Sequence, residues 1–468
     1  MRLPFLLVLP LALAACSLAP EYTRPPMDVP AAYKEDGAWK PAAAALPDPG
    51  KWWQAFGDPL LDRLEEALIV DNQNLKIAEA QYRAARAAVD AARAGLFPTL
   101  GLSAAASRGS TGSGSSTGGS RGITDLYSLS GQAAWEVDLW GRIRNGVDAA
   151  GAKAEASAGT LGAARLSAQA LLAQTYFQLR AAEAQTELLN RTVTAYQRFV
   201  ELTRNRQAAG LVSALDVAQA ETLLNGALTQ LADARLSRAQ NEHAIAVLVG
   251  RPPAALALPA GSGLPAVPGA PALIPSATLE SRWDIYSAER QVAAANAQIG
   301  VARAAWFPVL DIAANGGFRN TVLSNLITTP ARFWSLGPTL ALTLFDAGAR
   351  SAALTQAEAG YDQAAAAYRQ TVLTAFQEVE DNLVAAHLLM DESVSQQAAL
   401  AAARRAREIA ENQYRAGTAA SLNVIVAQAA ELSAENNAIA IWNRRMAAAV
   451  QLYKNIGGRP LADRQAAE

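Results

Sequence analysis

The strongest constraint on the fold of this chain is an internal duplication. The segment ARAGLFPTL at 92–100 returns as ARAAWFPVL at 302–310, 210 positions later. Three more pairs follow at nearly the same offset: IAEAQ at 77–81 with SAERQ at 287–291, AAGLVSALDV at 208–217 with RAGTAASLNV at 415–424, and GRP at 250–252 with GRP at 458–460. Such ordered self-similarity indicates two copies of one unit of about 200 residues. We predict a first repeat at 57–250, a Pro/Gly-rich linker at 251–275 and a second repeat at 276–456, followed by a short tail at 457–468.

Each repeat contains a predicted β-hairpin, at 97–139 in the first copy and at 307–346 in the second. Within these segments apolar residues alternate with small or polar ones, which is the period of a β-strand. Leu129 and Trp135 fall on one face, for example, and Ser128 falls on the other. Each strand has roughly ten residues, the length that crosses a bilayer at a tilt. The alternation alone would also fit two soluble hairpins packed on a core.

A long helix is predicted after each hairpin, at 142–206 and at 350–413. At 1.5 Å per residue the first would be about 95 Å long, which exceeds the roughly 30 Å of a bilayer core. Each long helix ends at a glycine, Gly210 or Gly417, which suits a left-handed cap. Partner helices are predicted to return at 213–249 and 421–456, and shorter helices to lead into the hairpins at 60–94 and 277–304.

Apolar and small residues recur at heptad steps along both long helices, which indicates coiled-coil packing between helices. In the first helix one series reads Leu172, Leu179, Thr186, Val193, Val200, and its companion reads Ala168, Thr175, Ala182, Leu189, Tyr196, Thr203. In the second helix the predicted series are Phe376, Leu383, Met390 and Val372, Val379, Ala386.

The N-terminus reads as an export signal. Residues 1–15 combine one basic residue, an apolar stretch and small residues before Cys16, the only cysteine in the chain. The motif LAAC resembles a bacterial lipobox, in which the cysteine is acylated and becomes the first residue of the mature protein. Ser17, rather than Asp, resembles an outer-membrane address. We therefore expect a lipid-anchored, extended segment at 16–56, although an ordinary signal peptide beside an unmodified cysteine would look similar.

Other chemistry has little support in the sequence. The net charge of −2 does not favour nucleic-acid binding, and no enzyme is predicted. The two G-x-S-x-G matches at 114–122 lie in a Ser/Gly-rich loop without strand–turn–helix context. His243 and His387 stand alone, so no metal site is expected, and the only non-protein group expected is the lipid on Cys16. Trp52 and Trp53 are predicted to pack the N-terminal segment against the helices.

Four strands per chain cannot close a barrel, and an open sheet edge in lipid would leave backbone groups unpaired. The smallest spanning barrels have about eight strands. The chain must therefore associate if its hairpins cross a membrane. Three copies would supply twelve strands.

The chain resembles the TolC/OprM-like outer-membrane efflux proteins, in the lipid-anchored, NodT-type branch of RND tripartite systems. Beside the duplication, the resemblance rests on PEYTRP at 20–25, WWQAFGDPLLDRL at 52–64, WEVDLWGRIR at 135–144 and LFDAGARSA at 344–352. It implies a mixed α/β membrane protein that forms a homotrimer, with a 12-stranded β-barrel on a periplasmic α-helical barrel. It also implies a Gram-negative outer-membrane location, and passive conduction of drugs or other toxic compounds from an inner-membrane RND-type transporter and a periplasmic adaptor to the exterior.

The resemblance also implies functional residues at the two helical turns. The turns that would dock the adaptor are formed by Ala209, Gly210, Leu211, Val212, Ser213 and by Ala416, Gly417, Thr418, Ala419. The periplasmic gate of relatives carries carboxylates, and the corresponding residues here are Asp216 and Asn423. Because Asn423 stands where Asp is frequent, we expect a weak acidic ring and a modest preference for cations.

Three alternatives compete with this interpretation. A tunnel for type I protein secretion would have the same fold. A periplasmic adaptor lipoprotein would also have a signal, a lipobox and long helices, but it would lack the twofold repeat. A trimeric coiled-coil adhesin would not need two membrane hairpins in each chain. The sequence does not name the cargo.

Overall fold

A computed structural model describes residues 17–30, 33–34, 51–110, 123–261, 263–269 and 282–456. The predictions for Cys16, for the loop with the G-x-S-x-G matches and for the C-terminal tail lie outside the described residues. The chain divides into two compact units, one formed by 1–26, 81–158 and 287–369 and the other by 27–80, 159–286 and 370–468. Each unit takes segments from both sequence repeats, so the unit of duplication is not the unit of packing.

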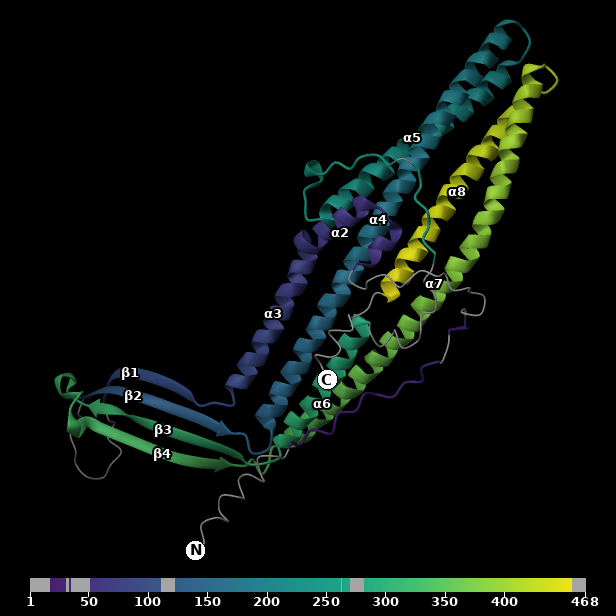
Figure 1. The fold of residues 1–468 in the computed structure, drawn as a ribbon. Helices are drawn as coiled ribbons and strands as arrows, with labels where there is room; N and C mark the ends of the chain where they lie inside the picture. The colour runs from purple at the N-terminus through teal and green to yellow at the C-terminus, as the bar shows by residue number, and fades with distance from the viewer. Residues whose placement is uncertain are drawn as a thin grey trace. The chain divides into compact units, whose positions relative to one another are not determined.

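The first unit contains a four-stranded antiparallel sheet with the strand order β1-β2-β3-β4 (Figure 1). The strands are β1 (Thr99–Ser110), β2 (Ile123–Val137), β3 (Val309–Asn320) and β4 (Arg332–Ala341). β1 and β2 form the hairpin of the first repeat, and β3 and β4 form that of the second. Because β2 pairs with β3, the two hairpins join in one continuous sheet.

The register gives the sheet two chemically different faces. Leu100 pairs with Ala133, which pairs with Ala314 on the next strand. This apolar face is open in the single chain, where Leu100 is 84% and Trp334 79% exposed. On the other face the Ser103 and Ser130 hydroxyls lie 3.0 Å apart. Directly opposed residues share a face, so the predicted alternation holds across all four strands.

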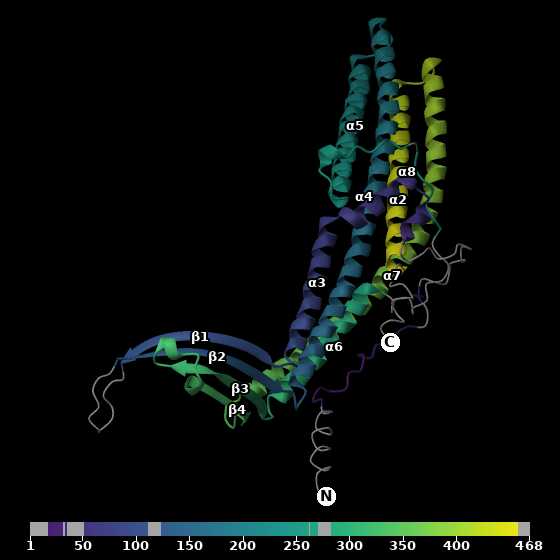
Figure 2. The same ribbon diagram turned by 60° about the vertical axis from the view of Figure 1, so that its left-hand side comes forward.

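Seven α-helices are present in the described part of the chain: α2 (Pro59–Asp71), α3 (Gln73–Ala94), α4 (Arg142–Ala208), α5 (Ala214–Leu248), α6 (Trp283–Ala304), α7 (Ala349–Arg415) and α8 (Ser421–Ile456). Both long helices, α4 and α7, have 67 residues. In the second unit α4 lies beside α5 and α7 beside α8 (Figures 1 and 2). None of the described helices is apolar enough over a sufficient length to traverse a bilayer.

The prediction of one helix at 60–94 is wrong, because the chain breaks at Asn72. This residue has an extended backbone with φ −63° and ψ 122°. Its side chain accepts a hydrogen bond from the Leu75 amide at 3.0 Å and donates to the Leu248 carbonyl at 2.7 Å. Asn72 thus caps α3 and ties the break to α5. Asparagine favours caps over helix interiors, but apolar periodicity continues across the break and hides it.

An apolar cluster of described residues in the second unit contains Trp52 and Trp53, each 1% exposed. These residues belong to the short 3₁₀ helix η2 (Trp52–Phe56), which packs against α4, α5 and α8 through Phe177, Ile245 and Met446. The predicted packing of the N-terminal tryptophans against the helices is therefore confirmed.

The heptad prediction holds along α4 but fails at one position of α7. Leu179 and Leu189 of α4 are buried as expected. Met390 of α7 was predicted in the seam, yet it is 50% exposed in the single chain, and Leu389 and Ser393 are buried instead. A straight α-helix drifts by about 20° per heptad, so the buried face moves off a strict seven-residue series.

Candidate functional site at the two helical tips

The two interhelical turns have the same backbone geometry. Gly210, two residues after the end of α4, has φ 72°, and Gly417, two residues after the end of α7, has φ 75°. The Gly210 amide donates to the Gln207 carbonyl at 2.9 Å, and the Leu211 amide donates to the Arg206 carbonyl at 2.9 Å. The second turn repeats both bonds, and this pattern is a Schellman motif. The predicted left-handed glycine caps are therefore confirmed in both copies.

Asp216 closes the first tip as part of a capping box at the start of α5. The Ser213 hydroxyl, as N-cap, lies 3.3 Å from the Asp216 amide. In return, the Asp216 carboxylate accepts hydrogen bonds from the Ser213 amide at 2.9 Å and from its hydroxyl at 2.6 Å. This reciprocal arrangement satisfies amides that would otherwise lack partners at the helix start.

Asp216 also binds the second tip. The hydroxyl of Ser421, the first residue of α8, donates to the other carboxylate oxygen of Asp216. Ser421 is 3% exposed, so its hydroxyl has little access to water. Hydrogen bonds from the Ser213 side chain, and then from Ser421, lower the pKa of the Asp216 carboxyl. The carboxylate is therefore ionised and joins the two turns within one chain.

The turns are further joined by an aromatic contact between α4 and α7. The guanidinium of Arg206 lies 4.2 Å from the ring centroid of Tyr414 and donates to the Tyr414 carbonyl at 3.1 Å. The rings of Phe199 and Tyr414 lie 5.7 Å apart. An Arg over an aromatic face is attractive, and the bond to the carbonyl fixes its position. The pair α4–α5 therefore contacts the pair α7–α8 in two ways, at the turns and between the ends of α4 and α7.

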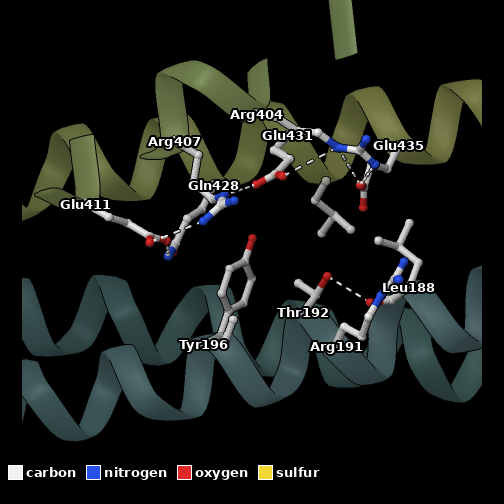
Figure 3. A pocket seen from close by; sticks show the side chains of 12 residues that line it. Leu188, Arg191, Thr192, Tyr196, Arg404, Arg407, Glu411, Gln428, Glu431 and Glu435 are labelled. Carbon is white, nitrogen blue, oxygen red and sulfur yellow. Dashed lines mark hydrogen bonds and ion pairs between the residues drawn. The ribbon is translucent and has the colours of Figure 1, made fainter. Parts of the chain in front are cut away.

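A polar cavity of about 290 Å³ lies between α4 on one side and α7 and α8 on the other (Figure 3). On its α7–α8 wall Arg407 binds Glu411 at 3.2 Å and Glu431 at 2.5 Å, and Arg404 binds Glu435. The pKa of Glu431 is raised, and burial is the largest cause of this shift, which the neighbouring arginines oppose. The pairs of Arg407 with Glu431 and of Arg404 with Glu435 join α7 to α8, whereas the pair of Arg407 with Glu411 lies within α7.

α4 contributes Tyr196 to the same cavity. Tyr196 is 3% exposed, and its hydroxyl has no hydrogen-bond partner among the described residues. Burial, followed by the nearby Glu431, raises the pKa of Tyr196 to about 12. The α4 wall also contains Leu188, Arg191, Thr192 and Ala195, and the first three of these are labelled in Figure 3. Arg191 of this wall pairs with Glu187 of its own helix at 3.7 Å, so the first repeat meets the ion-pair network of the second with a separate ion pair.

The structure brings the predicted tip residues together into two exposed turns. Leu211 is 73% exposed, whereas Val212 is half-buried. The exposed residues of the two turns are Ala209, Gly210, Leu211, Ser213, Ala416, Gly417 and Thr418, and Ala419 is half-buried. Asn423 is exposed on α8.

Sequence reasoning missed Ser421. The aligned repeats indicate this residue. The first copy has a serine at position 213, which aligns with Ala420, and the second copy has its serine one residue later, at 421. No group of three or more His, Cys, Asp or Glu side chains that could hold a metal occurs in the described part of the chain.

The sequence matches the family described as Outer membrane efflux protein over residues 64–251 and 274–458. The chain belongs to this family. The match falls in two segments, as the duplication requires. This family membership favours the channel over the alternatives of an adaptor lipoprotein and an adhesin.

Relatives of this chain are named as outer-membrane proteins, and the first of them as part of an efflux pump. The probable efflux pump outer membrane protein TtgC of Pseudomonas putida is 33% identical over 451 residues, covering 95% of this chain and 93% of the relative. Outer membrane protein OprJ of Pseudomonas aeruginosa is 32% identical over 460 residues, covering 97% and 95%. The chain is thus an outer-membrane efflux protein of the kind found in Gram-negative bacteria.

Solved structures confirm the predicted fold class. The outer-membrane channel OprN superposes with a TM-score of 0.88 at 31% identity, covering 95% of this chain and 99% of that channel. CusC superposes with a TM-score of 0.83 at 27% identity, covering 95% and 100%. An internally duplicated chain of four strands and long helices is the architecture that these channels share with this protein.

Proposed function

We propose that this protein is the homotrimeric outer-membrane outlet of an RND-type tripartite pump, with the two glycine-capped turns as the docking site of a periplasmic adaptor. The observation that carries the proposal is the geometry of the turns. Two equivalent Schellman turns are exposed and tied together through Asp216. Six such turns in a trimer would form a ring with near sixfold repetition, which suits the ends of coiled-coil partner hairpins.

The proposed cargo is drawn from organic toxicants such as aromatic solvents and antibiotics. Three relatives support this proposal: TtgC and ArpC of Pseudomonas putida, the second named an antibiotic efflux pump outer membrane protein, and a toluene efflux pump outer membrane protein. Each is 33% identical to this chain over 451 residues. The outlet conducts passively, since selection of the cargo belongs to the inner-membrane transporter.

Asp216 forms the charged part of the proposed periplasmic gate, and the neutral Asn423 contributes no charge to it. Three Asp216 carboxylates in a trimer would give a weak anionic ring and a modest preference for cations. Single-channel recording of the protein and of Asp216→Asn tests this assignment. Strong cation selectivity that survives the substitution would show that the ring lies elsewhere.

Lipidation of Cys16 is the last part of the proposal. Acyl chains on this residue would anchor the N-terminal segment in the outer membrane, and two or more chains make such attachment stable. Intact mass of the purified protein tests this directly, because the mature chain would begin at residue 16 and carry the added acyl mass.

Adaptor docking is tested in a Gram-negative strain that lacks its own efflux outlet and carries a matched adaptor and RND-type transporter. The double variant Leu211→Glu/Thr418→Glu places charge on both turns. We expect resistance to fall to the level of the strain without an outlet, while the protein still reaches the outer membrane and runs as a heat-sensitive trimer on gels. Val247→Glu is a matched control, because Val247 is 64% exposed on α5 but distant in sequence from the turns. Full resistance in the double variant would contradict docking at the turns.

A further inference from the structure

Of the four described strands, only β4 places an aromatic residue on the polar face of the sheet. This residue is Phe333, which lies opposite Gly317 of β3, and the same row continues through Ser130 and Ser103. Arg319 shares this face, because it lies two residues beyond Gly317 on β3. Its guanidinium carbon lies 4.9 Å from the centroid of the Phe333 ring. A cation and an aromatic ring therefore lie together on a face whose other residues in this row are small.

The donors of this guanidinium remain available. Arg319 is exposed, and within the described ranges no hydrogen bond or ion pair engages its N–H groups. Phe333 is half-buried. Gly317 brings no side chain against the ring, and a Cβ there would collide with the Leu129 carbonyl of β2. The close approach of β2 and β3 thus keeps the position across from Phe333 free of a side chain.

The polar face changes its charge from one end of the sheet to the other. β3 follows α6 and ends at Asn320, so Arg319 lies at the hairpin end of the sheet. At the opposite end, Glu136 of β2 lies across from Asp311 of β3, and Glu136 accepts a hydrogen bond from Arg142 at 2.8 Å. Carboxylates therefore mark the end that joins the helices, and a guanidinium marks the end farthest from them.

In the trimer this face lines the barrel. Membrane barrels turn their apolar face to lipid and their polar face to the interior, because a charge in contact with hydrocarbon is costly. Three copies of Arg319 and Phe333 would therefore form a ring near the outer mouth, which every exported molecule has to pass. The ring would be positive and partly aromatic.

We propose that Arg319 and Phe333 together form a lumenal binding site for aromatic carboxylates. A carboxylate can accept two parallel hydrogen bonds from the planar guanidinium, and Phe333 offers an apolar ring surface to the aromatic part of the same molecule. Only a ligand with both groups uses both residues. The inference rests on the proposed trimeric outlet, because it makes aromatic acids a class of cargo that is held briefly at the exit.

The experiment measures binding of 2-naphthoate to purified trimers by ligand-observed NMR titration. We expect saturable binding that Arg319→Gln weakens by about tenfold or more, the range for hydrogen bonds to a charged group. Phe333→Leu keeps an apolar side chain without a π surface and should weaken binding by about two- to fivefold. If Arg319→Gln does not form trimers, Arg319→Lys keeps the charge without the planar fork and should weaken binding by about threefold.

Arg332→Gln is the matched control. Arg332 directly precedes Phe333 on β4, is also exposed and lies across from Phe318 on the apolar face. Its loss removes the same charge from the same end of the sheet but not from the lumen, so binding should change by less than about twofold. Decahydro-2-naphthoate is the control ligand, because it has the same charge without an aromatic ring, and it should bind more weakly.

Equal losses in Arg319→Gln and Arg332→Gln would overturn the inference, as would equal binding of the two acids or no saturable binding to the unaltered trimer. This measurement requires neither adaptor nor transporter. Intact binding by a protein that fails to restore resistance would therefore count against the proposed pump alone, and restored resistance without binding would count against this site alone.

Discussion

The two helical tips occupy equivalent positions in the two repeats, and they differ in how the second helix begins. Both have the same Schellman motif around a glycine with positive φ. At the first tip, Ser213 and Asp216 form a complete capping box. At the second tip the aligned positions are Ala420 and Asn423, and neither can reproduce that pair.

The second tip uses a serine displaced by one residue. Ser421 aligns with Ala214 of the first copy, and its hydroxyl reaches across to Asp216 rather than to its own helix. One carboxylate therefore serves both turns. The first tip is closed by its own residues, whereas the second tip depends on the first. The two repeats therefore differ at this point, and the two turns share one carboxylate.

Among these substitutions, loss of the Asp216 carboxylate should cause the largest loss of local stability at the tips. Asp216→Ala removes an acceptor used by the Ser213 amide, the Ser213 hydroxyl and the Ser421 hydroxyl. We expect a local loss of about 2–3 kcal/mol, from a cap and hydrogen bonds to a charged group. Hydrogen exchange of amides in the first turns of α5 and α8 measures it. Faster exchange in α5 alone would show that the second tip is independent.

Asn423→Ala is the natural control for that substitution, because it changes the aligned position of the second tip. Asn423 is exposed, so the expected change in stability is within about 0.5 kcal/mol. A loss as large as that of Asp216→Ala would show that Asn423 has a structural role equal to that of its counterpart.

Substitution of the glycine caps should affect the two tips equally. Gly210 and Gly417 have φ of 72° and 75°, and a side chain at either would meet nothing within 4 Å. Only backbone strain opposes alanine there, at about 1–2 kcal/mol for each site. Exchange of the last amides of α4 in Gly210→Ala and of α7 in Gly417→Ala gives the comparison. A clearly larger effect at one tip would mean that its turn is held by contacts beyond the shared motif.

Much of this architecture could be predicted from the sequence because each element has a local signal. Heptad series and the glycines at 210 and 417 predict the long helices and their ends, since caps depend on a few neighbouring residues. Strict alternation predicts the strands, because a shift of one residue would reverse their faces. The break at Asn72 was missed because apolar spacing continues on both sides of it.

Long-range contacts are harder to predict from the sequence. The bond between Ser421 and Asp216 joins residues 205 positions apart, and nothing near either residue specifies it. Only the repeat alignment hints at it, through the displaced serine. Met390 was misplaced for a different reason, since a strict heptad series does not follow the drift of a straight helix. The Tyr196 hydroxyl, which has no hydrogen-bond partner within the described ranges, likewise depends on how α4 meets α7 and α8.

A smaller change in local stability is expected from building the capping box of the first copy into the second copy. Ala420→Ser combined with Asn423→Asp would place a capping box at the start of α8, as in the first copy. We expect a gain of about 0.5–1 kcal/mol at the second tip. Combining this pair with Asp216→Ala tests the dependence directly, because α8 should then exchange slowly while α5 remains unprotected. If α8 still exchanges quickly, a local cap cannot replace the shared carboxylate.

A change of pH should alter the local stability of the tips less than any of these substitutions, because Asp216 is partly exposed. Its folded pKa is lowered, chiefly by the hydrogen bond from the Ser213 side chain. The folded state therefore binds fewer protons than the unfolded state in this range, and its stability falls as the pH falls. The contribution is complete above about pH 4, the ordinary range of an aspartate, and is lost as the pH drops through the lowered pKa. Exchange at the starts of α5 and α8, corrected for the intrinsic rate at each pH, should rise together on acidification. Asp216→Asn should abolish the common response, whereas a response that persists in this variant would place the titrating group outside the shared contact.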